Sequence, residues 1–214
     1  MQKIKHIIWD WNGTLLNDGW VFVNVMNTLL KSRDLPLINI KEYRKYFGFP
    51  VIEYYKHLGF DFKKESFEDY GKDFIKIYKK HQFDAELHND SIKILKKFYN
   101  QKIKNHILSA SHIKFLYDSV EYYNIKKYFS EIFGLKNYHA KGKIDIATEL
   151  FSLINCKNEE VLLIGDTIHD NEVANHLNIK SFLVTNGHQN KQRLKKTNSK
   201  IVSCLSDIIT EYEK

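Results

Sequence analysis

Short apolar runs alternate with segments of helical periodicity over most of this chain. Runs rich in Ile, Leu and Val, which predict buried strands, lie at residues 4–9, 103–108, 132–133, 161–164 and 181–184. Among them, apolar residues recur every third or fourth position, which predicts helices over residues 90–99, 112–123, 143–154, 169–177 and 205–212. Strands that alternate with helices indicate a parallel sheet covered by helices on both faces. We therefore expect an α/β fold with a doubly wound, Rossmann-like core.

Residues 17–85 interrupt this alternation. Asn17-Asp18-Gly19 is a natural helix start, and helical spacing without a convincing strand follows at residues 22–30, 42–47, 51–58 and 65–81. An all-helical block placed directly after the first strand predicts an insertion that sits over the end of the sheet as a cap. The expected domains are a core of residues 1–16 and 86–214 and an all-helical cap domain of residues 17–85.

Polar residues end three of the predicted strands, namely Asp10, Ser109 and Asp166. Ligands of open parallel sheets bind beyond the carboxyl ends of the strands, so these residues should meet although they are far apart in sequence. A Gly13-Thr14 turn follows Asp10, and a second carboxylate, Asp170, follows Asp166. Any one of these residues alone is most simply a solvent-facing strand end, but the set together indicates a site.

The chemistry of this set is coherent. Carboxylates without His or Cys form an oxygen-rich site, which suits Mg²⁺ better than zinc. A Mg²⁺ ion between Asp10 and a phosphate would reduce the repulsion between two anions and so permit carboxylate attack on phosphorus. Ser109 can hydrogen-bond a phosphoryl group, and Lys143, which follows Gly142 at a predicted helix start, can neutralise its charge.

The order of these motifs resembles that of the haloacid dehalogenase superfamily. The segment Asp10-Trp11-Asn12-Gly13-Thr14-Leu15 is similar to the family's Asp-x-Asp-Gly-Thr signature, and Ser109 and Lys143 are similar to its second and third motifs. The segment from Gly165 to Asp170, with its acidic residues four apart, resembles the fourth. The helical block falls where the C1-capped, phosphoglycolate phosphatase-like members carry their cap.

The resemblance implies a Mg²⁺-dependent phosphatase that hydrolyses a small phosphorylated metabolite through an aspartyl-phosphate intermediate. It implies catalytic roles for four residues, of which Asp10 is the nucleophile: Asp10, Asn12, Ser109 and Lys143. It implies metal ligands at Asp10, the backbone carbonyl of Asn12, Asp166 and, directly or through water, Asp170. It implies phosphate contacts from Ser109 and Lys143, and from the backbone of Gly13, Thr14 and Ala110.

Asn12 departs from the family pattern, because phosphatases of this family usually have a second aspartate there. That aspartate protonates the leaving oxygen and then activates water, and a carboxamide can do neither. General acid–base catalysis is typically worth about 10²–10⁴ in rate. We therefore expect slow turnover of alkyl phosphates, substrates with better leaving groups, or another base, for which His139 and His169 are candidates.

Three functional hypotheses stay open at this point. A phosphatase leads, followed by family chemistry on a carbon–halogen or carbon–phosphorus bond. The carbon–phosphorus reaction would draw on a cap lysine, for which Lys41, Lys45 and Lys56 are candidates. Dehalogenation would not need Asp166 and Asp170. The third hypothesis is a catalytically weak phosphate-binding or nucleic-acid-associated protein.

Composition and charge limit the classes of partner that we expect. The chain has 214 residues, 33 Lys+Arg against 26 Asp+Glu, and a formal charge of +7. The lysines are spread along the chain without the basic–aromatic interleaving of nucleic-acid surfaces, so we expect no nucleic-acid partner. No run approaches the about 18 apolar residues of a membrane span. Two distant cysteines suggest no disulfide framework. We expect a cytoplasmic protein, and the sequence does not specify its oligomeric state, its substrate or the cap residues that select it.

Overall fold

The protein contains one parallel six-stranded sheet. The computed structural model describes residues 4–136 and 142–212. The strands are parallel throughout and lie in the order β5 (Phe129–Leu135), β4 (Lys104–His112), β1 (His6–Trp9), β6 (Val161–Gly165), β7 (Lys180–Val184) and β8 (Lys200–Val202). This arrangement confirms the predicted α/β fold.

Helices cover both faces of the sheet, because side chains of successive strand residues point to opposite faces. Ile7 and Trp9 of β1 belong to a cluster with α5 (Ser91–Asn100), α6 (Ile113–Tyr122) and α10 (Leu205–Tyr212). Ile8, between them in sequence, packs on the other face with α7 (Lys143–Ile154) and α8 (Ile168–His176). Strands buried on both faces explain why the runs at β1 and β6 are continuously apolar.

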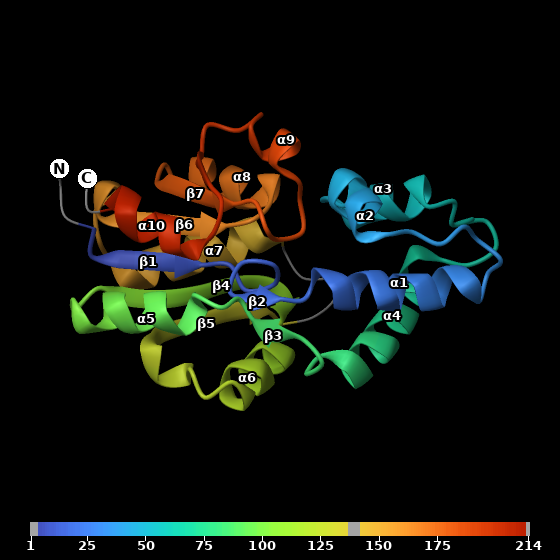
Figure 1. Ribbon diagram of the computed structural model, residues 1–214, viewed down its shortest axis with the longest axis horizontal. Coiled ribbons are helices and arrows are strands. Elements are labelled where there is room, and N and C mark those ends of the chain that lie inside the picture. The colour runs from blue at the N-terminus through green and yellow to red at the C-terminus, as the bar shows by residue number, and fades with distance from the viewer. Residues whose placement is uncertain (1–3, 137–141, 213–214) are drawn as a thin grey trace.

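A helical unit leaves the sheet after β1 and returns before α5. It comprises α1 (Gly19–Lys31), α2 (Ile40–Tyr46), α3 (Val51–His57) and α4 (Phe67–His81). Figure 1 shows it beyond the carboxyl end of β1. A short antiparallel pair, β2 (Leu16–Asn17) and β3 (Glu86–Leu87), joins the two crossings of the chain.

The helical unit has an apolar cluster of its own. This cluster is unusually aromatic and includes Tyr43, Phe47, Tyr54, Tyr55, Phe60 and Tyr70. Asn39 begins α2 with a capping box, in which its side chain accepts from the backbone N–H of Glu42 and the Glu42 side chain accepts in return. Local capping and a separate core explain why these helices form although they lie outside the sheet.

Several short elements were not predicted from the sequence. These are β2, β3, β8, the one-turn helix α9 (Lys191–Leu194) and the 3₁₀ turns Lys126–Tyr128 and Asn158–Glu160. Elements of two to four residues hold too few positions for a period to be visible. Strand β5 was also longer than the expected residues 132–133. Over residues 4–136 and 142–212, no helix is both long and apolar enough to span a membrane.

Candidate active site

Two carboxylates meet because their strands are neighbours. Trp9 of β1 pairs with Ile164 of β6, and the Asp10 N–H donates to the carbonyl oxygen of Ile164 over 2.8 Å. Asp10 and Asp166 therefore leave the sheet side by side. Asp170 joins them from the first turn of α8, and ligand oxygens of the three buried residues all lie within 4.8 Å of one another. Asp10 and Asp166 thus meet as predicted. Ser109 was expected to end its strand but lies inside β4, which continues to His112, and it still reaches the site, with its Oγ 3.5 Å from Asn12 Oδ1.

Lys143 lies inside this carboxylate group. It is the first residue of α7, as expected, and its side chain is 4% exposed. Its Nζ contacts Oδ1 of Asp10 and lies 2.6 Å from Oδ1 of Asp170. Burial alone would lower the pKa of Lys143, but the two carboxylates outweigh it and raise the pKa above its usual value. The lysine is therefore a fixed cation.

Hydroxyl and backbone groups hold the carboxylates in place. Thr14 Oγ1 donates to Asp166 over 2.9 Å and to Asp10 over 3.3 Å. Asp170 Oδ2 accepts from the backbone N–H of Thr167 at 3.0 Å, which is one half of the capping box of α8, and from the Thr167 hydroxyl at 2.7 Å. The predicted phosphate contact Thr14 is thus placed against the carboxylates themselves.

Three carboxylates surround one lysine in this site, and their pKa values differ accordingly. Burial, with the charges of Asp170 and Asp166, raises the pKa of Asp10 to about 8 despite Lys143. Burial also raises the pKa of Asp166 to about 6. Burial acts in the same sense on Asp170, but Lys143 and Thr167 hold its pKa below the usual value. Excess negative charge of this kind is what a divalent cation neutralises.

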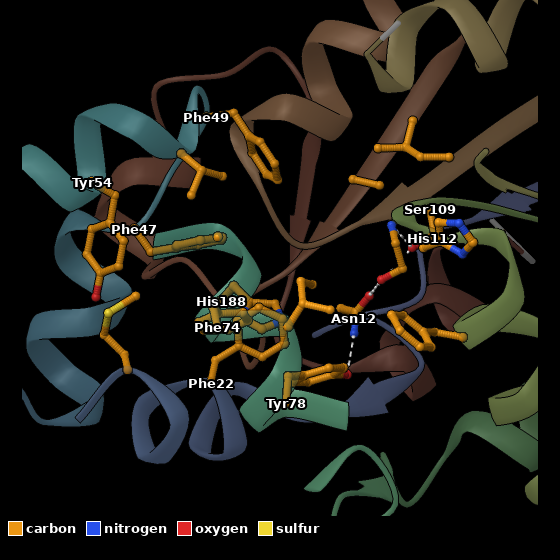
Figure 2. A pocket seen from close by; sticks show the side chains of 18 of the residues that line it. Asn12, Phe22, Phe47, Phe49, Tyr54, Phe74, Tyr78, Ser109, His112 and His188 are labelled. Carbon is orange, nitrogen blue, oxygen red and sulfur yellow. Dashed lines mark hydrogen bonds between the residues drawn. The ribbon is translucent and has the colours of Figure 1, made fainter. Parts of the chain in front are cut away.

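Asn12 is held by hydrogen bonds at both ends of its amide. Its Nδ2 donates to Asp18 Oδ2 over 2.6 Å and to the Tyr78 hydroxyl over 3.3 Å, as Figure 2 shows for Tyr78. Its Oδ1 accepts from the Ser111 hydroxyl over 2.6 Å, and Ser109 Oγ lies 3.5 Å away. Because a carboxylate at Asp18 can only accept, the amide nitrogen must face it.

Gly13 is required by the turn that follows Asp10. Its φ is +79°, and an added Cβ would run into His188 and Asp166. Its N–H donates to Asp18 Oδ1 over 2.9 Å and to the Leu16 carbonyl over 2.8 Å. The Thr14 N–H donates to the Trp11 carbonyl. These two amides, expected to contact phosphate, are thus engaged within their own loop.

Sequence reasoning missed a buried polar group behind this loop. His188 Nε2 lies 3.2 Å from Asp18 Oδ1, its Nδ1 lies 2.7 Å from the Tyr43 hydroxyl, and its backbone N–H donates to Asp166 Oδ2 over 2.5 Å. Burial alone would lower the pKa of His188, but Asp18 raises it to about 8. A signal was available, because His188 follows the carboxyl end of β7 closely, as Asp10 and Asp166 follow theirs.

A cavity of about 760 Å³ opens between this site and the helical unit. Asp10, Ser109, Ala110 and Lys143 line one end of it, and the rest of its wall is mostly apolar and aromatic. Tyr43 of α2 and Phe47, which directly follows that helix, line the cavity, whereas Tyr46 is exposed. Figure 2 shows Phe22, Phe47, Tyr54 and Phe74 around this space, with Ser109 at its other end and Asn12 next to Tyr78.

Of the candidate bases and lysines predicted from the sequence, only His169 lines the described cavity. His169 lines the cavity, pairs with Glu172 at 2.8 Å and packs against Phe49, while His139 lies outside the described residues. Lys41, Lys45 and Lys56 are exposed and do not line the cavity found among the described residues. The lysines of α4 that do line it are Lys72, Lys76 and Lys79.

Comparison with known families establishes the family of the chain. The family model described as haloacid dehalogenase-like hydrolase matches residues 7–184, a span that includes all the carboxylates, Ser109 and Lys143. The chain belongs to the haloacid dehalogenase-like hydrolase family. The resemblance read from the motifs is thereby confirmed.

Individual haloacid dehalogenase-like relatives are distant. The chain is 23% identical over 177 residues to the pyrophosphatase PpaX of Listeria monocytogenes serotype 4a (strain HCC23), covering 80% of this chain and 79% of the relative. A haloacid dehalogenase-like hydrolase from Streptococcus pneumoniae superposes with a TM-score of 0.85 at 21% identity, covering 99% of this chain and 100% of the other. A structure described as a predicted phosphoglycolate phosphatase from Haemophilus somnus gives 0.80 at 17% identity, covering 99% of each. At such identities the structures establish a shared fold.

Proposed function

We propose that this protein is a Mg²⁺-dependent phosphatase that transfers the phosphoryl group of a small phosphorylated metabolite to Asp10. One observation carries the proposal: Asp10 stands at the wall of a ligand-sized cavity, in contact with a buried lysine and beside two further buried carboxylates. A nucleophilic carboxylate needs neighbouring positive charge before it can approach a phosphate. Lys143 supplies one such charge.

The donor set fits a magnesium ion. Asp10, Asp166 and the backbone carbonyl of Asn12 would hold it, with Asp170 directly or through water. All are oxygen donors, as Mg²⁺ prefers, and the pKa values of Asp10 and Asp166 are raised by burial and, to a smaller extent, by the neighbouring carboxylates. When bound, the ion would neutralise charge on both the carboxylate and the phosphate.

The remaining steps follow from this chain's own residues. Asp10 attacks phosphorus, and the bond from phosphorus to the leaving oxygen breaks. Lys143 and Ser109 orient the phosphoryl group from the wall of the cavity. Water then cleaves the phosphorylated Asp10 and restores the carboxylate. Asn12 offers only hydrogen bonds at the point where a proton donor is usual, so leaving-group chemistry matters more here.

The helical unit fits the role of a cap. We assign residues 17–85 to the cap and residues 1–16 and 86–214 to the core. Contacts between them support a closed arrangement: the Gln189 amide donates to the Phe47 carbonyl over 3.1 Å, and Arg44 donates to the Asn186 carbonyl over 2.7 Å. Opening of these contacts would admit substrate, and their closure would exclude water from the transfer.

The competing chemistries find less support. Dehalogenation does not need Asp166 and Asp170, yet both are buried and placed beside Asp10. Imine chemistry on a carbon–phosphorus bond needs a lysine in the cavity. The three cap lysines expected from the sequence do not line the described cavity, and the lysines that do, Lys72, Lys76 and Lys79 of α4, are the ones a test of that chemistry would replace. Phosphate ester or anhydride hydrolysis is also the activity named for relatives such as the Listeria pyrophosphatase.

The test is phosphate release from a panel that includes p-nitrophenyl phosphate, pyrophosphate and 2-phosphoglycolate, with and without Mg²⁺. The proposal expects Mg²⁺-dependent release by the wild type and loss of at least about 10³-fold in Asp10→Asn. Release that survives in Asp10→Asn would refute the nucleophile. Binding of phosphate without any release would favour the phosphate-binding alternative.

A further inference from the structure

The wall of the cavity beside Asp10 is mostly aromatic and apolar, although Lys72, Lys76 and Lys79 of α4 also line it. Phe22 and Met26 of α1, Tyr54 of α3, and Phe74 and Tyr78 of α4 line it, as Figure 2 shows for the labelled aromatic residues. The rings form a continuous set of contacts, with the Phe22 centroid 5.4 Å from that of Phe74 and 5.2 Å from that of Tyr78. Aromatic walls of this kind favour flat, apolar ligands, because ring pairs stack or meet edge to face.

The size of the cavity points the same way. Its volume of about 760 Å³ lies within the range of about 300–1,000 Å³ typical of sites for ligands with tens of atoms. Pyrophosphate or phosphoglycolate would occupy only the polar end near Lys143 and Ser109. The aromatic end would then enclose no ligand surface, and the burial of that apolar wall would contribute nothing to substrate binding.

A second, independent observation concerns the leaving group. The Asn12 amide cannot donate a proton, and its hydrogen bonds to Asp18 and Ser111 hold it in one orientation. An oxygen that departs without protonation must be stable as an anion. A phenol has a pKa of about 10. An aliphatic alcohol is closer to the 15.7 of water. Phenolic oxygen can therefore leave where alkoxide cannot.

We propose that the substrate is a small aryl phosphate, in which the phosphate is esterified to an aromatic hydroxyl group. The inference rests on the proposed function and specifies its substrate class. Asp10 forms the new bond to phosphorus while the phosphorus–oxygen bond to the ring breaks, and the electron pair leaves on the phenolate. Water then attacks phosphorus, Asp10 leaves as carboxylate, and both protons of the water remain on dihydrogen phosphate. No oxidant or further reactant is needed.

The experiment separates leaving group from size with four phosphates. These are 2-naphthyl phosphate, 2-(2-naphthyl)ethyl phosphate, acetyl phosphate and 2-phosphoglycolate. The first two share the naphthyl ring, but one releases a phenolic oxygen and the other an aliphatic alkoxide. The last two are small, and one releases a carboxylate and the other an aliphatic alkoxide. We expect kcat/KM for 2-naphthyl phosphate to exceed that for the naphthylethyl ester by at least about 100-fold, the lower end of acid catalysis. We expect it to exceed that for acetyl phosphate at least tenfold.

Variants test the two observations separately. Asn12→Asp should shrink the ratio between the two naphthyl esters. Phe22→Leu should raise KM for 2-naphthyl phosphate severalfold without changing that for acetyl phosphate. Trp20→Leu is the matched control on the same helix, because Trp20 is 43% exposed and does not line the described cavity.

The outcomes distinguish this inference from the function on which it rests. Efficient, Asp10-dependent hydrolysis of 2-phosphoglycolate or of the naphthylethyl ester, equal to that of the aryl ester, would overturn the inference and leave the phosphatase intact. So would an equal preference for acetyl phosphate. Failure to hydrolyse any of the four, acetyl phosphate included, would overturn both.

Discussion

Asn12 donates a hydrogen bond to the buried carboxylate of Asp18 over 2.6 Å. The same carboxylate accepts from the Gly13 N–H and lies 3.2 Å from His188. Asp18 therefore fixes the amide, the turn that follows Asp10 and the loop after β7 together. Residue 12 itself has no acidic proton to donate, but its side chain contacts the carboxylate of Asp18 directly.

This contact makes the effect of Asn12→Asp depend on Asp18. The variant places two carboxylates within hydrogen-bond distance, so one of them must hold a proton or move. We expect faster hydrolysis of alkyl phosphates, but by less than the about 10²–10⁴ of full acid–base catalysis, together with a lower melting temperature. The swap Asn12→Asp/Asp18→Asn should recover part of the stability and rate. Strictly additive effects of the two changes would show that the residues are not coupled.

Lys143 is the cation whose loss should be felt most. Lys143→Met leaves Asp10 and Asp170 buried together without a counter-charge, and breaking a buried pair costs about 3–5 kcal/mol. We expect phosphate release to fall by at least about 100-fold and thermal unfolding to occur at markedly lower temperature. Lys114→Met removes an exposed partner of Asp118 and should change stability by less than about 1 kcal/mol. Equal behaviour of the two variants would contradict the site.

Magnesium should stabilise the fold more at high pH. Burial raises the pKa of Asp10 to about 8 and that of Asp166 to about 6, so the folded metal-free protein holds protons that the unfolded chain has released. Because of these two groups, the free energy of unfolding falls as pH rises towards 8. A cation that binds the ionised carboxylates restores that stability. We expect the Mg²⁺-induced rise in melting temperature to be larger at pH 8 than at pH 6, and to be reduced in Asp166→Asn. A rise that is independent of pH and of Asp166 would refute this metal site.

The strand ends of the site could be predicted because the parallel topology brings them to one edge. Asp10, Asp166 and the first residue of α7, Lys143, lie where the alternation of strands and helices placed them. Ser109 does not end its strand as expected, because β4 continues to His112. Short polar segments gave no such signal. Asp18 read only as a helix start, and its contacts with Asn12 and His188 depend on how the loop after β7 folds back.

The cavity beside the helical unit could not be predicted from the sequence either. Helical spacing predicted which residues of α1 and α4 share a face, but the same spacing describes core packing and a ligand cavity. Phe22 and Phe74 lie on such faces, and only the arrangement of the helices relative to β1 shows that they border a space open to Asp10. Pattern alone cannot distinguish a filled interior from an empty one.

A buried histidine pair in strands β1 and β4 should lower the stability of the fold as pH falls. His6 and His106 stack on adjacent strands with ring nitrogens 3.0 Å apart. Burial, with His6 and Lys104, lowers the pKa of His106 to about 3, so the folded state resists a proton that the unfolded chain accepts near 6.5. Stability is thus present above pH 6.5 and lost below it, by up to about 1.4 kcal/mol per pH unit. His106→Gln should flatten the melting-temperature profile between pH 6.5 and 4.5; an unchanged slope would exclude this cause.

The most direct test of the account is to trap the phosphoryl group on Asp10. The enzyme is mixed with 2-naphthyl phosphate or acetyl phosphate and Mg²⁺, quenched during turnover, reduced with borohydride and mapped by peptide mass spectrometry. The account predicts reduction of residue 10 to homoserine, only when substrate and Mg²⁺ are both present, and no such product in Asp10→Asn. Phosphate release with an unmodified Asp10, or with the label on another residue, would contradict it.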